Sequence, residues 1–115
     1  GGGSMYIAGD NATIRNSTFE FEKSAGYGGA IWFYNHNVKI DNCTFKSCNA
    51  NRYGGAIYAN YENATITNCN FENNTANFGG SIYVVFQITL DISLQSFLPL
   101  FNVLFLIYTN HPSLL

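Results

Sequence analysis

The chain is built from short runs in which apolar and polar residues alternate, with Gly and Asn between the runs. The segment Ala64-Thr65-Ile66-Thr67-Asn68 is typical of this pattern. Alternation with a period of two predicts half-buried β-strands, and no apolar period of helical length is present. We therefore expect an all-β protein made of short strands.

A repeat of 25 or 26 residues organises these runs. Gly-Gly pairs open the successive units at Gly2-Gly3, Gly28-Gly29, Gly54-Gly55 and Gly79-Gly80. The units are therefore 2–27, 28–53 and 54–78, and a fourth begins at 79. A fixed period of this length is typical of solenoids, so residues 1–83 are predicted to form about three stacked coils.

The composition of the unit selects the kind of solenoid. Helical repeats do not fit the alternation, and residues 1–83 contain no Leu, which excludes leucine-rich repeats. Three short strands and three turns fit one unit, so we predict a right-handed parallel β-helix. Stacked strands lie ~4.8 Å apart, so like residues form columns along the stack. The predicted structural ladders are Asn11, Asn37 and Asn63; Asn16, Asn42 and Asn68; and Phe19, Phe45 and Phe71.

Two motifs carry a family resemblance. Gly28-Gly29-Ala30-Ile31 and Gly54-Gly55-Ala56-Ile57, together with Phe71-Glu72-Asn73-Asn74, resemble the GGAI and FxxN repeats of chlamydial polymorphic outer membrane proteins. The adhesin-like β-helix proteins of methanogenic archaea are similar. The resemblance covers residues 2–83 and implies surface display and adhesion, without a particular ligand. The last FxxN position departs from the pattern in two units, as Glu22 and Cys48.

The sequence changes character at about Val84. All glycines precede this point, all leucines follow it, and residues 84–115 contain no Lys or Arg. We expect a non-repeat hydrophobic tail that is a cap over the open core, a membrane anchor, or a spurious gene end. A membrane-spanning helix needs ~20 apolar residues, whereas the uninterrupted apolar stretch is shorter and Asp91 lies before it. Membrane association is expected only through this tail, and self-association through open solenoid ends.

Charge and cysteine content narrow the functional classes. The net charge is -2, and the five Lys and Arg residues are scattered, so no nucleic-acid partner is expected. Cys43 and Cys69 share a column with Ser17, and stacked free thiols are favoured over a disulfide there. With two His residues and no C-x-x-C pair, we expect no metal and no cofactor.

Two columns of titratable residues define the enzymatic alternative, which is a fragment of a β-helix polysaccharide lyase or glycoside hydrolase. One column contains Asp10, His36 and Glu62, and in the other Arg15 stacks beside Asp41. The first column sits at an expected turn, where charged residues are commonly solvated. Another column, Glu20, Lys46 and Glu72, alternates in sign as surface cross-strand pairs do. We therefore expect no catalytic residues.

A stripe of aromatic residues is the candidate binding surface. Tyr6, Trp32, Tyr58 and Tyr83 stand four residues after the first Gly of each unit. If Ile31 faces inward, strand alternation places Trp32 outward. The alternatives are that the tail or a neighbouring domain covers the stripe, or that the opposite register buries these rings in the core. The stripe would then offer flat rings on which sugars or a partner protein could stack. The sequence therefore favours a non-enzymatic, secreted or cell-surface, adhesin-like fragment that presents this surface to a glycan or to a protein of a host or neighbouring cell.

Overall fold

Every element in the described part of the chain is a β-strand. The computed structural model describes residues 3, 5–33, 36–60, 64–85, 91–98 and 103–106. The strands are β1 (Met5–Ile7), β2 (Thr13–Arg15), β3 (Thr18–Glu20), β4 (Lys23–Ser24), β5 (Ile31–Phe33), β6 (Lys39–Asp41), β7 (Thr44–Lys46), β8 (Asn49–Ala50), β9 (Ile57–Asn60), β10 (Thr65–Glu72), β11 (Ile82–Val85), β12 (Asp91–Leu98) and β13 (Val103–Leu106). Within these residues no helix is long and apolar enough to cross a membrane.

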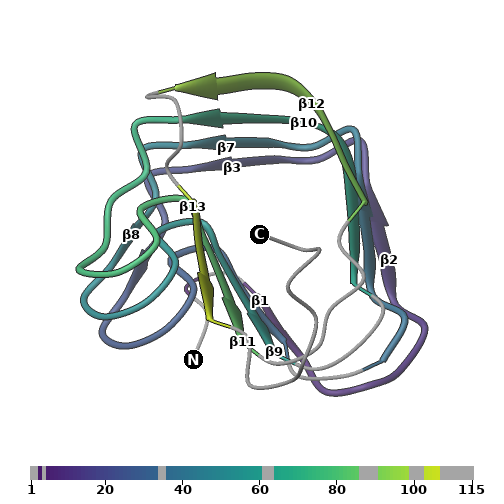
Figure 1. The fold of residues 1–115 in the computed structure, drawn as a ribbon, viewed down its shortest axis with the longest axis horizontal. Coiled ribbons are helices and arrows are strands. Elements are labelled where there is room, and N and C mark those ends of the chain that lie inside the picture. The colour runs from purple at the N-terminus through teal and green to yellow at the C-terminus, as the bar shows by residue number, and fades with distance from the viewer. Residues whose placement is uncertain are drawn as a thin grey trace.

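The strands wind into a solenoid whose sides are parallel sheets (Figure 1). One side has the order β1-β5-β9-β11-β13, and a second sheet has the order β2-β6-β10-β7-β3 with β12 paired to β10. The second sheet turns a corner, because β10 pairs with β6 through its first half and with β7 through its second half. The short pair β4-β8 closes the remaining side. The predicted all-β parallel solenoid is confirmed.

The register of the sheets reproduces the sequence period. Ile31 pairs with Met5 on one side and with Ile57 on the other, and Ile57 pairs with Ile82. Each strand therefore lies one unit away from its neighbour. Equivalent residues of successive coils consequently stack in columns that run along the solenoid axis.

Apolar columns fill the interior. Ile31, Ile57 and Ile82 are fully buried, and so are Ile40 and Ile66 on the opposite sheet. The rings of Phe45 and Phe19 stack with centroids 5.0 Å apart, and those of Phe45 and Phe71 with centroids 5.1 Å apart. The predicted Phe ladder is thus a continuous stack inside the core. Because the period of a strand is two, the residues between these columns point outward.

The corners of each coil require left-handed backbone. Positive φ recurs in four columns, which contain Asn11 and Asn37; Asn16, Asn42 and Asn68; Phe21, Ser47 and Asn73; and Gly28, Gly54 and Gly79. Asn tolerates this conformation better than most residues with a Cβ. The main role of the Asn columns is therefore to form the corners of the coils, and the side-chain ladders are an additional role.

Amide ladders connect the Asn corners of the first two coils. Asn37 donates to Asn11 Oδ1 at 3.0 Å, and Asn42 donates to Asn16 Oδ1 at 2.7 Å. Asn68 instead donates to Asp41 Oδ1 at 3.2 Å, because that carboxylate is a stronger acceptor within reach. The third member of the first ladder, Asn63, lies outside the described residues.

The Gly-Gly motif has two separate steric causes. Gly54 has φ +66°, and a Cβ there would also collide with the backbone of Ile57. Gly55 stands where the next coil comes closest, so a Cβ would meet the carbonyl oxygen of Gly80. The first Gly makes the turn, and the second allows neighbouring coils to approach.

Strand stacking continues beyond Val84, where the sequence repeat ends. β11 runs across this position, β12 pairs with β10, and β13 pairs with β11, all in parallel. The register aligns Ile92 with Ile66, Phe97 with Phe71, and Val103 with Ile82. The choice between a cap, an anchor and a spurious end stays a prediction, but the described strands of this segment extend both sheets.

Candidate binding surface

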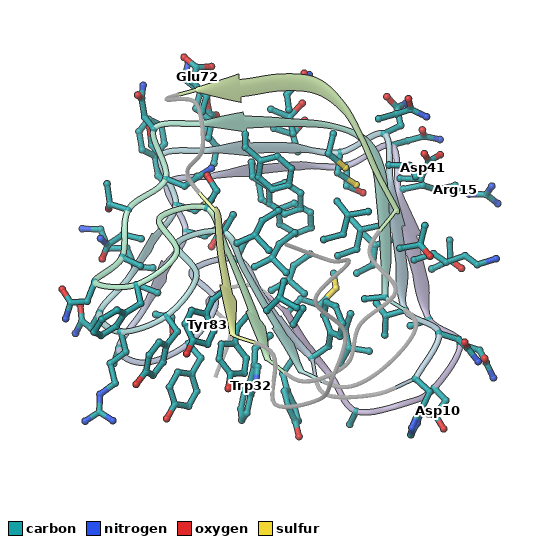
Figure 2. The ribbon with its side chains drawn as sticks, in the orientation of Figure 1. Asp10, Arg15, Trp32, Asp41, Glu72 and Tyr83 are labelled. Atoms are coloured by element: carbon teal, nitrogen blue, oxygen red, sulfur yellow. The ribbon has the colours of Figure 1, made fainter. Side chains whose placement is uncertain are left out.

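The predicted aromatic stripe lies on the outer face of the first sheet. Strands β1, β5, β9 and β11 place Tyr6, Trp32, Tyr58 and Tyr83 in one register column. Trp32 is half-buried, whereas its neighbours Ile31 and Phe33 are fully buried. Trp32 therefore points away from the core, as alternation requires (Figure 2).

A second aromatic column packs against this stripe. The Gly turns fold Tyr27, Tyr53 and Phe78 back onto the sheet, so that Tyr27 lies 4.8 Å from Tyr58, and Tyr53 lies 4.6 Å from Tyr83, between ring centroids. Sequence reasoning missed this contact. The available signal was an aromatic residue directly before each Gly-Gly turn. We call the two columns together the aromatic surface: Tyr6, Trp32, Tyr58, Tyr83, Tyr27, Tyr53 and Phe78.

The rings of the aromatic surface cover one another's faces. Tyr58 and Tyr83 stack at 5.6 Å with 6° between their planes, and Tyr27 and Tyr53 stack at 5.3 Å with 29°. Tyr83 is only 6% exposed, whereas Tyr6 at one end is 46% exposed. The stacked rings in the middle of the surface therefore present mainly their edges. Trp32 differs, because it meets Tyr27 and Tyr58 in T-shaped contacts at 61° and 68°, and Phe78 at the end of its column is 51% exposed.

The column of Asp10 and His36 lies at an exposed corner. The backbone N–H of His36 donates to Asp10 Oδ1 at 3.0 Å, and His36 Nδ1 lies 3.5 Å from the same oxygen. The side chain of His36 is 48% exposed and that of Asp10 is 53% exposed. Glu62, the third residue of this column, lies outside the described residues. The carboxylate of Asp10 therefore acts as an acceptor that joins two coils at the turn.

Arg15 and Asp41 are register partners on the outer face of the second sheet (Figure 2). Asp41 accepts hydrogen bonds from the Thr67 hydroxyl at 2.6 Å and from Asn68 Nδ2 at 3.2 Å. These two bonds, with a smaller contribution from Arg15, lower the pKa of Asp41. A carboxylate held in its ionised form is a poor general acid. Asp41 therefore links its coil to the next one through these hydrogen bonds.

The remaining charged column also follows strand pairing. Lys46 lies between Glu20 and Glu72 in register, on the outer face of β3, β7 and β10. Within the part of the chain that the structure describes, no group of three His, Cys, Asp or Glu side chains could hold a metal ion.

All three cysteines are free and buried. Burial raises the pKa of each thiol, and that of Cys69 rises to about 11. Cys69 donates to the Thr67 carbonyl at 3.2 Å, and Cys43 donates to the Asp41 carbonyl at 3.4 Å. These thiols fill space in the core, and their raised pKa values disfavour nucleophilic chemistry.

The last position of the FxxN motif has a structural role that sequence reasoning did not assign. Asn74 is buried, accepts from the backbone N–H of Cys48 at 2.9 Å, and donates to the Phe45 carbonyl at 3.1 Å. In the preceding coil Cys48 occupies this position, and its thiol donates to the Phe19 carbonyl at 3.5 Å. The motif therefore satisfies buried backbone groups between coils.

Comparison with known proteins agrees with this geometry. Residues 1–93 match the family described as "Right handed beta helix region". No curated protein and no solved structure matches the chain significantly. The match spans most of the chain and agrees with the parallel solenoid, so the protein belongs to the right-handed β-helix family.

Proposed function

We propose that the chain is a non-enzymatic display scaffold of a secreted or cell-surface protein. It is adhesin-like, and it presents the aromatic surface to a glycan or to a protein of a host or neighbouring cell. The finer kinship that we propose is with the GGAI and FxxN repeat proteins of the polymorphic outer membrane type and with similar methanogen adhesin-like proteins. This kinship rests on the motifs of residues 2–83.

The observation that carries the proposal is the aromatic surface. Tyr and Trp offer large amphipathic contact area at low entropic cost, and contiguous exposed apolar patches mark interaction sites. Here the rings are already ordered by mutual stacking, as in the pair of Tyr58 and Tyr83. A partner would not have to immobilise them, which favours binding.

The polar columns support a scaffold rather than an enzyme. Asp10 and Asp41 each accept hydrogen bonds from the next coil, so they hold the stack together. The alternative is a fragment of a β-helix polysaccharide lyase or glycoside hydrolase, and it rests on the exposed pair of Asp10 and His36. Those enzymes require a carboxylate poised to transfer a proton to or from the sugar.

Binding can be followed through Trp32, which is the only Trp in the chain and belongs to the aromatic surface. The full chain is titrated with a panel of soluble oligosaccharides and purified cell-surface proteins while Trp32 fluorescence is recorded. The proposal expects at least one ligand to change the emission, and Tyr58→Ser to weaken its binding.

The matched control is Phe21→Ser, which removes a 67% exposed aromatic ring that lies outside the aromatic surface. It should leave binding unchanged. Loss of binding in both variants, or in neither, would count against the aromatic surface. Release of new sugar ends from a polysaccharide, abolished by Asp10→Asn, would favour the enzymatic alternative.

A further inference from the structure

The rings in the middle of the aromatic surface cover one another's faces. Tyr53 is stacked between Tyr27 at 5.3 Å and Phe78 at 5.4 Å, and it also contacts Tyr58 at 6.1 Å. Tyr27 lies with its plane 24° from that of Tyr58, also in a stacked arrangement. A ligand that approaches from solvent therefore meets the rims of these rings.

Ring rims have a definite electrostatic character. The quadrupole of an aromatic ring places negative charge on the face and positive charge on the edge. Tyr also carries a hydroxyl group that donates a hydrogen bond at the rim. A surface of stacked Tyr edges therefore favours acceptor and anionic groups. It disfavours ligands that need a free ring face, such as quaternary ammonium groups and sugars that stack by their C–H face.

The turn that holds Tyr53 also holds a cation. Arg52 is exposed and directly precedes Tyr53 in the turn. Its backbone N–H donates to the Gly26 carbonyl at 3.0 Å, and its carbonyl accepts from Phe78 N–H at 2.9 Å, so the backbone at Arg52 is tied to the coils on both sides. Among the described residues, Arg52 makes no ion pair.

The turns stacked on that of Arg52 carry no acidic residue. The turns that carry the second aromatic column, residues 25–28, 51–54 and 76–79, contain no Asp or Glu. The outward positions Tyr6, Trp32, Tyr58 and Tyr83 are also uncharged. Asp10 lies apart from Tyr83, at the corner of the coil that follows β1 (Figure 2). The chain as a whole is acidic, with a net charge of -2, so this local bias is opposite to that of the molecule.

We propose that the aromatic surface and Arg52 together dock an acidic polypeptide segment of a partner protein. This inference rests on the proposed function and specifies the partner. The guanidinium of Arg52 pairs with a carboxylate, in the two-bond geometry that Arg favours, and the Tyr edges contact the neighbouring backbone and side chains. A polypeptide fits better than a glycan, because the central rings Tyr27, Tyr53 and Tyr58 already stack on neighbouring rings, and a sugar that stacks needs a free ring face.

The test compares two synthetic peptides of equal length, one rich in Glu and its counterpart with Gln at the same positions. Each is titrated into the full chain while Trp32 fluorescence is recorded. The Glu peptide should bind, and the Gln peptide should bind much more weakly. Arg52→Gln should weaken binding of the Glu peptide by up to about fivefold. The matched control Lys39→Gln removes an exposed cation from β6 on the other sheet and should have little effect.

Three results would overturn the inference. One is equal binding of the Glu and Gln peptides, and another is an unchanged affinity in Arg52→Gln. The third is binding of a carboxylated oligosaccharide where the Glu peptide fails. In the third case, sensitivity to Tyr58→Ser would still support the proposed function, so the two proposals fail separately. If no ligand of any class responds to Tyr58→Ser, both fail.

Discussion

Phe21 is the residue whose replacement should stabilise the fold. It occupies a corner with φ +58°, in the column of Ser47 and Asn73, which have φ +54°. Its ring is 67% exposed, so the core gains little from it. A large side chain in left-handed backbone is strained, whereas Asn adopts this conformation readily.

The size of the effect follows from the backbone. Left-handed conformation costs an ordinary residue about 1–2 kcal/mol, and Asn avoids part of this cost through local hydrogen bonds. Phe21→Asn should therefore raise the free energy of unfolding by about 1 kcal/mol. In a small domain this corresponds to an increase in Tm of about 4–8 °C. Phe21→Ala removes the same ring but retains a Cβ without an amide, so it should change stability little.

The assay is chemical or thermal unfolding of the full chain, followed by Trp32 fluorescence and far-ultraviolet circular dichroism. The order of stability should be Phe21→Asn above both Phe21→Ala and the parent. If the Asn variant is no more stable than the Ala variant, the conformational argument for the Asn corners is wrong. If both variants are equally destabilised, the ring of Phe21 makes stabilising contacts despite its large exposed fraction.

Four further outcomes can be checked. Gly55→Ala should destabilise the protein by about 3 kcal/mol in urea unfolding, because the added Cβ meets backbone of the next coil. The pKa of Asp41 is lowered in the folded protein. The ionised carboxylate therefore stabilises the fold at pH values above 3.8, and this stabilisation is lost as the pH falls below 3.8. Asp41→Asn should make Tm less dependent on pH in that range. Because the pKa of Cys69 is raised to about 11, alkylation of this thiol at pH ~8 should be about a hundredfold slower in the folded protein than after unfolding, as peptide mass spectrometry can measure. Ile92 aligns with the buried Ile66, so Ile92→Asp should lower Tm strongly. Ser93 aligns with the outward Thr67, so Ser93→Asp should lower Tm little. Equal effects of the two variants would argue against continuation of the coils beyond Val84.

The sequence by itself determined the stack. A period of 25 or 26 residues with alternating polarity predicts a solenoid in which equivalent residues of successive coils pair in parallel. The inward Ile and Phe columns and the Asn corners follow directly, because stacking repeats the same chemistry at each coil. Even the outward orientation of Trp32 follows once Ile31 is assigned to the core.

Contacts between residues from different columns depended on tertiary structure. The period does not say how far a Gly turn folds back, so it could not show that Tyr27 and Tyr53 reach Tyr58, or that the rings cover one another's faces. It also could not show that Asn68 leaves its own ladder for Asp41. Nor could it show that β12 and β13 pair with the sheets beyond Val84. A repeat specifies what stacks along the axis, whereas contacts around the coil depend on turn geometry, which only the folded backbone sets.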